Sequence, residues 1–385
     1  MTTTPARPRG RMVFADMARG IGALGVVYGH IMMLWMPERH RVAPAYFDFL
    51  SVLGWHSTQL PVDPGQVAVP VFFLISGFVV TPAALAEGPR GFVVKRLLRI
   101  YPPLLFAVLL AAAVLLVGLH PLQISGSGTV TATALLSNAT LANFILVPQY
   151  AFVGVAWTLA VEIICYCTTL LILPLLRRIP WYAMCVELTF AALVIIAARA
   201  LGATFFLFAV LVSFLPIFTV GRVLWAIHAG KLRARWGITL GAAAWTMYVL
   251  ADRLQFGRVN SAYELAFAYA LLLFCVGLAV EPKLRPNRAF SYVAQRSYSI
   301  YLLHGVVLFP ALDLLSGPLS LGIALPLALA GTAAAVEACH RLIERPCRAL
   351  STRLTARGKA PPEQPRAPIG RTTESWLGSV ERTPG

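Results

Sequence analysis

The chain has 385 residues, of which 58% are hydrophobic and only 12% are charged, and its formal net charge is +16. A water-soluble domain has roughly 25% charged residues, so this composition excludes an ordinary soluble protein and indicates a multi-pass membrane protein. The excess of Lys and Arg is therefore interpreted as a topology signal rather than as a nucleic-acid-binding surface.

Ten apolar segments follow one another along the chain, and basic residues flank the end of every segment that we expect to run inward. The positive-inside rule then places both termini in the cytosol, in an all-α bundle of about ten transmembrane helices. The Thr/Ser/Asn-rich stretch 120–150 is only moderately apolar, and we expect a loop or a re-entrant piece there. The predicted segments are 12–36, 67–86, 104–119, 153–176, 181–199, 203–226, 236–251, 261–280, 298–315 and 318–338.

Three regions are expected: a basic cytosolic tail over 1–11, a membrane domain over 12–350, and a disordered cytosolic tail over 351–385. The last region is rich in Pro, Gly, Ser, Thr and Arg and has no apolar face. No cleavable signal is predicted at the N-terminus. The six cysteines include no CxxC pair and are interpreted as small core residues, so neither a disulfide framework nor a metal site is expected.

The first segment carries Asp16, Arg19 and His30, which are unusual side chains for a membrane helix. An ionised group at the helix centre costs roughly 2.5 to 3.5 kcal/mol, so such groups mark functional positions by default. Arg19 and His30 share a helix face about 16 Å apart along the axis, which places Arg19 near the cytosol and His30 in the outer half. A neutral imidazole there suits a general base; the alternative is a histidine that only hydrogen-bonds within the bundle.

Glu162 belongs to a second polar stripe, Thr158, Glu162 and Tyr166, on an otherwise apolar helix that begins near Trp157. This helix runs inward, so Glu162 also lies in the outer half, and we expect it to meet His30 and orient the imidazole. The alternative is a structural ion pair with a cation of another helix.

Lys95, Arg96 and Arg99 precede Tyr101 at the cytosolic end of the third segment. They are first of all a topology signal, but Arg96 and Arg99 share one helix face and would also suit a phosphate-bearing ligand from the cytosol. Both interpretations stay open on the sequence alone.

Two further groups lie at membrane depth. Ser76-Gly77-Phe78 is not part of a G-x-S-x-G elbow, so we predict no nucleophile there and favour close helix packing that shapes a channel. Ser297, Tyr301 and His304 form a third polar stripe in the ninth segment, where a structural hydrogen bond by His304 is as reasonable as catalysis.

Taken together, these pieces resemble the membrane-bound acyltransferase-3 family over about residues 12–348. Each motif is weak alone, but six of them stand in the family's order. They read Asp16-x-x-Arg19 with His30, Phe72-Phe73-Leu74-Ile75-Ser76-Gly77-Phe78, Arg96-x-x-Arg99-Ile100-Tyr101-Pro102, Trp157-Thr158-Leu159-x-x-Glu162, Ser297-Tyr298-Ser299-x-Tyr301-Leu302-x-His304 and Glu344-Arg345-Pro346.

The resemblance implies an O-acyltransferase of the inner or plasma membrane that uses cytosolic acyl-CoA as co-substrate, with acetyl as the default acyl group, and no permanently bound cofactor. The acceptor is expected to be a sugar-containing hydroxyl compound: a surface glycan, a lipid-linked precursor or a glycosylated metabolite. Membrane lipids are the other expected partners, and no nucleic acid is expected. The resemblance ties the residues that match Arg19, His30, Arg96, Arg99 and Ser76-Gly77-Phe78 to activity.

The resemblance and the residues together suggest one mechanism. Acyl-CoA docks in the cytosolic half, and its thioester enters the bundle along Arg19. His30 then activates the acceptor hydroxyl for direct transfer of the acyl group. Catalytic roles are assigned to His30, Glu162, Arg19 and Asp16. Donor binding is assigned to Arg96, Arg99, Lys95, Ser76 and Tyr101, and substrate orientation to Trp157, Thr158, Tyr166, Tyr301 and His304. The oxyanion donor is not identified; Tyr166, Tyr301 or a backbone amide are the candidates.

Two other classes of function compete with this hypothesis. A proton-coupled exporter of a polar metabolite could use the same intramembrane ions, but the sequence shows neither an inverted repeat nor matched broken helices. A scaffold for cell-envelope assembly would tolerate alanine at all of these positions.

Overall fold

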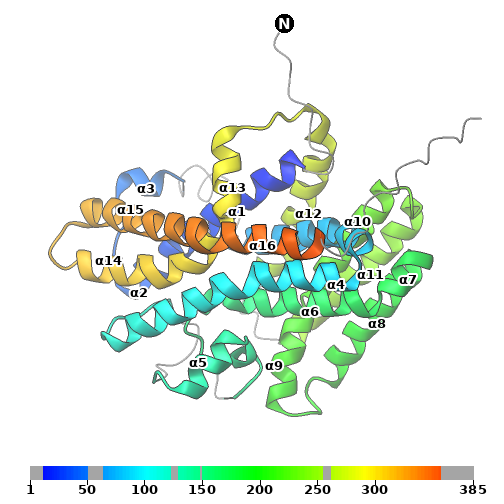
Figure 1. The fold of residues 1–385 in the computed structure, drawn as a ribbon, viewed down its shortest axis with the longest axis horizontal. Helices are drawn as coiled ribbons and strands as arrows, with labels where there is room; N and C mark the ends of the chain where they lie inside the picture. The colour runs from blue at the N-terminus through cyan, green and yellow to red at the C-terminus, as the bar shows by residue number, and fades with distance from the viewer. Residues whose placement is uncertain (1–11, 51–63, 123–128, 148–149, 255–261, 357–385) are drawn as a thin grey trace, which may run out of the picture.

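The structure is a computed structural model that describes residues 12–50, 64–122, 129–147, 150–254 and 262–356. Within these ranges every regular element is a helix (Figure 1). Eight of the described helical stretches are long and apolar enough to cross a membrane. The expectation of an all-α membrane bundle is confirmed.

The elements, in chain order, are α1 Val13–His30, η1 Ile31–Trp35, α2 Met36–Glu38, α3 Ala45–Leu50, α4 Pro64–Leu116, α5 Ala132–Ala139, η3 Ala142–Phe144, η4 Gly154–Ala156, α6 Trp157–Leu171, α7 Leu173–Arg178, α8 Pro180–Ala197, α9 Ala203–Val212, α10 Leu215–His228, α11 Ala234–Arg253, α12 Ala262–Val280, η5 Glu281–Lys283, α13 Arg288–Leu303, η6 His304–Leu308, α14 Phe309–Leu315, α15 Leu321–Cys339, η7 His340–Glu344 and α16 Arg345–Ala356. Three of the short elements, η1, η6 and η7, are π-helical turns inside longer helices.

The number of spans differs from the ten predicted segments for two reasons. The second and third predicted segments are joined in α4, a single 53-residue element with a kink at Gly88. Gly88 has φ 71° and ψ 172°, a backbone conformation that is essentially restricted to glycine, and Pro89 follows it. The seventh predicted segment corresponds to α11, which is helical but is not among the eight candidate spans.

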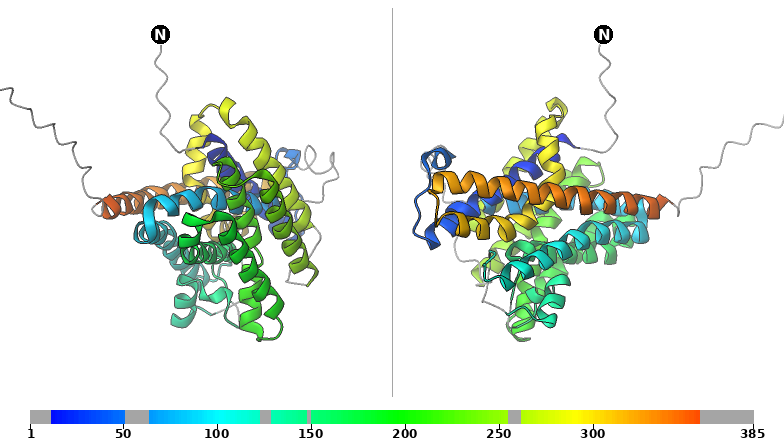
Figure 2. Two further views of the ribbon diagram at one scale, coloured as in Figure 1. Left: turned by 90° about the vertical axis from the view of Figure 1, so that its right-hand side faces the viewer. Right: turned by 60° about the vertical axis from the view of Figure 1, so that its left-hand side comes forward.

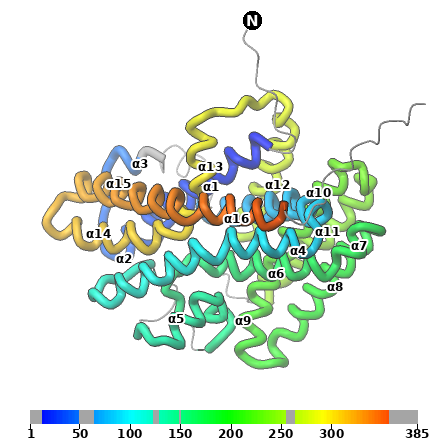
Figure 3. The backbone as a smooth tube through the Cα atoms, in the orientation of Figure 1, coloured from blue at the N-terminus to red at the C-terminus, as the bar shows by residue number. Residues whose placement is uncertain are grey.

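Helix α4 lies at the centre of the bundle, where it contacts α1, α10, α12 and α16 (Figures 1 and 3). Its closest crossing is with α10, because two glycines remove the side chains at the contact. An added Cβ at Gly77 would lie 2.0 Å from the carbonyl oxygen of Phe218, and one at Gly221 would lie 2.2 Å from that of Leu74. The backbones therefore touch directly, as small residues allow in membrane bundles.

Helix α1 is fixed at its N-terminus by the short turn η5, which directly follows α12. The carboxylate of Glu281 accepts hydrogen bonds from the backbone N–H groups of Val13 (2.9 Å) and Phe14 (2.7 Å). It thereby satisfies two orphan donors and places a negative charge at the positive end of the helix dipole. The ring of Phe14 packs against Gly277 and the ring of Phe274. Because α1 also packs along α4 and α13, its polar residues face the interior of the bundle.

The last helical stretch extends beyond its predicted end. Helix α15, the π turn η7 and helix α16 follow one another without interruption and form one long rod (Figure 2). The chain is helical through Ala356, so the first residues of the region predicted to be disordered from 351 are ordered. The rest of that region, 357–385, and the predicted N-terminal tail 1–11 lie outside the described residues.

The stretch 120–150 does not form a membrane span in its described parts. Helix α5 has eight residues, too few to cross a bilayer, and it packs against α4. Asn138 organises the segment, because its side chain bonds the carbonyl of Tyr150 (3.0 Å) and the N–H of Phe152 (2.8 Å). The prediction of a loop or re-entrant piece is consistent with this arrangement.

Candidate active site

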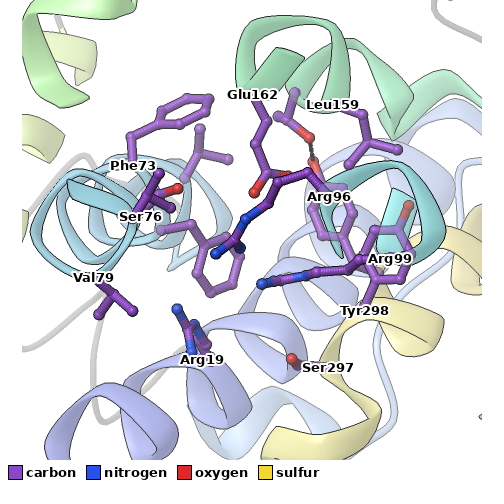
Figure 4. Close-up of a pocket in the computed structure, with 15 residues that line it drawn as sticks. Arg19, Phe73, Ser76, Val79, Arg96, Arg99, Leu159, Glu162, Ser297 and Tyr298 are labelled. Carbon is purple, nitrogen blue, oxygen red and sulfur yellow. Dashed lines mark hydrogen bonds between the residues drawn. The ribbon is translucent and has the colours of Figure 1, made fainter. Parts of the chain in front are cut away.

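A cavity of about 110 Å³ lies between α1, α4, α6 and α13 (Figure 4). The two arms of α4 on either side of its kink both contribute to it, with Ser76 from the first arm and Arg96 and Arg99 from the second. Apolar side chains such as Phe72, Phe73 and Leu159 complete the wall. Its polar lining consists of Arg19, Ser76, Arg96, Arg99, Thr158, Glu162, Ser297, Tyr298 and Tyr301.

Three guanidinium groups, from Arg19, Arg96 and Arg99, converge on this cavity (Figure 4). No carboxylate of a described residue lies within ion-pairing distance of any of the three. Arg96 is held by aromatic rings instead, with its guanidinium carbon 5.2 Å from the ring centre of Phe92 and 5.3 Å from that of Tyr166. Its buried Nε has no hydrogen-bond partner within the described structure.

Among the described residues Glu162 is the one carboxylate that lines the cavity, and it lies beside Arg96 and across from Arg19 (Figure 4). It accepts a hydrogen bond from the hydroxyl of Tyr166, one helical turn further along α6. Three arginines and one glutamate leave a formal charge of +2 on the cavity lining, so the cavity is suited to an anion.

The structure separates Glu162 from His30. The imidazole of His30 pairs with that of His304, with 2.9 Å between Nδ1 of His30 and Nε2 of His304, and the ring centres are 5.1 Å apart. No described hydrogen bond joins His30 to Glu162, and His30 does not line the cavity. The expected His30–Glu162 pair therefore does not form: His30 pairs with His304, and Glu162 pairs with Tyr166. The position of a residue along its span predicts its depth, but not which neighbouring helix its side chain faces.

Tyr301 connects these two groups. It lines the cavity, and its ring centre lies 6.1 Å from that of His304 and 6.3 Å from that of Phe72. Its hydroxyl donates to the carbonyl of Val155 (3.2 Å) and accepts from Thr158 (3.0 Å). Because the hydroxyl of Tyr166 is likewise used by Glu162, neither tyrosine proposed as an oxyanion donor has its proton free in this arrangement.

Several other predicted site residues lie outside the cavity lining. Lys95 forms an ion pair with Glu87 (2.7 Å) and does not join Arg96 and Arg99 in the lining. Asp16, Tyr101 and Trp157 do not line the cavity either, and Trp157 packs against the ring of Phe214 at 5.0 Å.

A buried polar network braces α13 against the last helical stretch. Glu344 accepts hydrogen bonds from Ser299, from Nδ1 of His340 (3.0 Å) and from Arg348 (2.9 Å). Ser299 and Glu344 belong to the sequence motifs, but no role had been assigned to either. The network lies next to Arg99 of α4 and Tyr298 of α13, which line both the cavity and a small hollow that reaches Glu344.

A second buried group had no counterpart among the predicted site residues. Arg222 on α10 pairs with Glu187 on α8 (3.3 Å) and donates to Thr169 on α6 (2.7 Å). Glu187 also accepts from Thr168 (3.1 Å) and Thr219 (2.9 Å). The signal in the sequence was a carboxylate within an apolar segment, which is unusual enough to predict an ionic partner inside the bundle.

The similarity of the chain to known proteins shows which class of protein it belongs to. Residues 12–337 match the acyltransferase-3 family, described as "Acyltransferase domain", and the chain belongs to this family. It is a membrane acyltransferase. The chain is 30% identical over 321 residues to Nodulation protein 10 of Rhizobium leguminosarum bv. viciae, a match that covers 75% of this chain and 84% of that protein. No solved structure matches the chain significantly.

Proposed function

We propose that the protein is an O-acyltransferase that moves an acyl group, with acetyl as the default, from cytosolic acyl-CoA to a hydroxyl of a sugar-containing acceptor. The observation that carries the proposal is the convergence of Arg19, Arg96 and Arg99 on one cavity, with no carboxylate of a described residue within ion-pairing distance and a formal charge of +2 on the lining. The sugar-containing acceptor, and a location in the inner or plasma membrane, rest on the family resemblance alone.

Three guanidinium groups share this cavity with the one carboxylate of Glu162, and the two positive charges left over are costly in an apolar bundle unless a ligand supplies negative charge. Guanidinium groups bind phosphate through two parallel hydrogen bonds, and the donor acyl-CoA carries phosphates. The cavity is too small for a whole CoA molecule, so we place only the phosphate-bearing part next to the arginines. The remaining part of the donor then extends along the bundle toward the histidine pair.

Helix α1 connects the two ends of the proposed site. Arg19 and His30 lie on one face of it, about 16 Å apart by helical rise, a span comparable to an extended pantetheine arm. A donor anchored by its phosphates at Arg19 would therefore present its thioester near His30. There, His30 removes the proton of the acceptor hydroxyl, the oxygen attacks the thioester carbonyl, and CoA leaves as the thiolate.

The test is CoA binding by the full-length protein in lipid nanodiscs, which needs no knowledge of the acceptor. An Arg96→Gln/Arg99→Gln variant removes two charge-assisted contacts, each worth about 1.5–3 kcal/mol, so we expect the Kd for CoA to rise at least about 100-fold. The matched control is Arg177→Gln/Arg178→Gln, which removes the same charge from an exposed cytosolic helix end. Equal affinities for the two variants would contradict the docking site.

The second part of the test is turnover. Membrane vesicles that contain the protein, supplied with acetyl-labelled acetyl-CoA, should release free CoA thiol and incorporate label into a glycan or lipid fraction. The His30→Gln variant should bind CoA normally but lose transfer. If the wild-type protein moves label across the membrane as intact metabolite and releases no thiol, the acyltransferase proposal fails and an exporter is favoured.

A further inference from the structure

We infer that His304 is a positioning residue that fixes the tautomer of His30, so that Nε2 of His30 carries the lone pair that receives the acceptor's proton. This inference rests on the proposed role of His30 as the general base. It follows from the hydrogen bonds of the two imidazole rings, which leave one consistent placement of the protons when both rings are neutral.

The chain of hydrogen bonds begins at a backbone carbonyl. Nδ1 of His304 lies 3.1 Å from the carbonyl oxygen of Ile300, one turn earlier on α13. A carbonyl oxygen only accepts, so Nδ1 of His304 carries a proton. In a neutral imidazole the other nitrogen is then an acceptor, and Nε2 of His304 presents a lone pair.

The protonation of His304 determines which nitrogen of His30 carries a proton. Nε2 of His304 lies 2.9 Å from Nδ1 of His30, and this short contact needs one proton between the two nitrogens. Because Nε2 of His304 has none, Nδ1 of His30 is the donor, and its Nε2 is left as the basic nitrogen. No described residue hydrogen-bonds to that Nε2. His304 is fully buried whereas His30 is only half-buried, so His30 is the member of the pair that a substrate reaches.

A π-helical turn begins at or directly after each of the two histidines. His304 opens the π turn η6, and His30 directly precedes the π turn η1. Single π turns inside α-helices are rare and frequently occur at functional sites. The turn at His304 is held by the next residue, because the carbonyl of Gly305 accepts a 2.7 Å hydrogen bond from the N–H of Leu122.

Packing on the outer side fixes the distance between the two rings. The segment after His30 and the segment after His304 share an apolar cluster that contains Ile31 and Leu308. Further out, Asp313 accepts hydrogen bonds from Trp35 (2.9 Å) and from two nitrogens of Arg39 (2.5 and 2.8 Å). This clamp joins the same two segments, so the imidazole pair lies within a rigid frame.

The proposed path carries one proton from the acceptor hydroxyl, through Nε2 of His30, to the CoA thiolate. The acceptor O–H bond breaks, its proton moves to Nε2 of His30, and the oxygen forms a bond to the thioester carbon. The carbon–sulfur bond then breaks, and the CoA thiolate takes the proton from Nε2 of His30. Throughout, Nδ1–H of His30 donates to Nε2 of His304, and this hydrogen bond strengthens while His30 is an imidazolium.

The first test is spectroscopic and does not depend on activity. In protein labelled with ¹⁵N-histidine, with the His30 signals assigned by their loss in His30→Gln, we expect Nδ1 to be protonated and Nε2 to be bare. Free histidine favours the opposite tautomer. In His304→Leu the acceptor is gone, and the His30 signals should revert toward the Nε2–H form. A wild-type His30 in the Nε2–H tautomer would overturn the inference.

The second test separates positioning from folding. His304→Leu should lower kcat by about 100-fold, the scale of a lost general base, and leave the KM for acetyl-CoA unchanged. His304→Gln, whose amide oxygen also accepts a hydrogen bond, should recover most of that loss, and His120→Leu is the exposed control. If His304→Gln is as inactive as His304→Leu, the positioning role is wrong. If the wild type itself transfers no acetyl, the proposed function fails while the tautomer result still stands.

Discussion

At the scale of single residues, Glu162 is the group whose role changes most once its surroundings are known. Its carboxylate lines the same cavity as three arginines and accepts a hydrogen bond from Tyr166. A carboxylate in this position lowers the positive potential of the cavity and so weakens the binding of an anion. We therefore expect Glu162 to adjust how tightly the donor is held and how readily CoA leaves.

The substitution Glu162→Gln tests this role. Removing one negative charge near an anionic ligand in this cavity changes the interaction by about 1 kcal/mol or more, so the Kd for CoA should fall at least about fivefold. The change should weaken with added salt, because the effect is electrostatic. Titration of CoA into nanodisc-embedded protein at low and high salt measures both effects.

A matched comparison separates this role from the orientation of His30. The variant Tyr166→Phe removes the hydrogen bond to Glu162 but keeps the charge, and its CoA affinity should stay near that of the wild type. If Glu162→Gln instead leaves CoA affinity unchanged and abolishes transfer as His30→Gln does, then Glu162 acts by orienting the imidazole of His30.

The sequence predicts which residues are unusual, but not which of them meet. His30, Glu162 and the two arginines of α4 were recognised because ionisable groups are rare in apolar segments. The partner of His30 was missed because span position gives depth only, whereas contact also depends on the rotation of each helix and on its neighbours. The sequence assigned His304 to substrate orientation, and only the structure shows its 2.9 Å contact with His30.

At the scale of elements, the crossing of α4 and α10 positions the whole first arm of α4. Gly77 and Gly221 bring the two backbones into contact, and Ser76, the neighbour of Gly77, lines the cavity. The adjacent turn of α10 carries Arg222, whose backbone N lies 3.0 Å from where a Cβ of Gly77 would be. The motif around Ser76 is therefore explained mainly by close packing.

The variant Gly77→Ala tests this explanation. Its methyl group would overlap the carbonyl oxygen of Phe218, and the two helices would have to separate. Overpacking of this kind costs about 1–3 kcal/mol, so thermal unfolding in detergent should begin at a clearly lower temperature. CoA affinity should fall as well, because the arm that carries Ser76 moves.

The control is Gly331→Ala in α15, where no atom lies within 4 Å of the added Cβ. Alanine is the better helix former by about 0.5–1 kcal/mol, so this variant should match or exceed the wild type in stability. If both variants unfold at the wild-type temperature, the glycine crossing does not limit the bundle.

Sequence periodicity predicted most helices near their observed positions, but not how they join. The second and third segments were expected to be separate helices joined by a basic loop, and the chain instead passes through a kink at Gly88 within α4. The dipeptide Gly88-Pro89 is compatible with either a loop or a kink, and only the packing of both arms against other helices decides between them. The continuation of the last helix to Ala356 was missed because its polar residues suggest disorder unless α4 covers one side of α16.

At the scale of the whole molecule, the proposed site is divided by depth. Arg19, Arg96 and Arg99 lie at the end of the bundle that we expect to face the cytosol, and the His30–His304 pair lies about 16 Å further along α1. Helix α1 carries both Arg19 and His30, and α13 lines the cavity with Tyr301 just before the π turn η6 begins at His304. An acyl donor from the cytosol and an acceptor from the other side could therefore meet without either one crossing the membrane.

This division requires a defined orientation, which cysteine accessibility can measure. His40 lies exposed just beyond the outer end of the first span, and Arg178 lies exposed at the end of α7, which we expect inside. With a membrane-impermeant maleimide on intact cells, His40→Cys should be labelled, and Arg178→Cys should be labelled only after permeabilisation. The unsubstituted chain, with its six native cysteines, sets the background. Labelling of Arg178→Cys from outside would put the arginine cavity on the side that cytosolic acyl-CoA does not reach, and transfer across the membrane in the proposed direction would be ruled out.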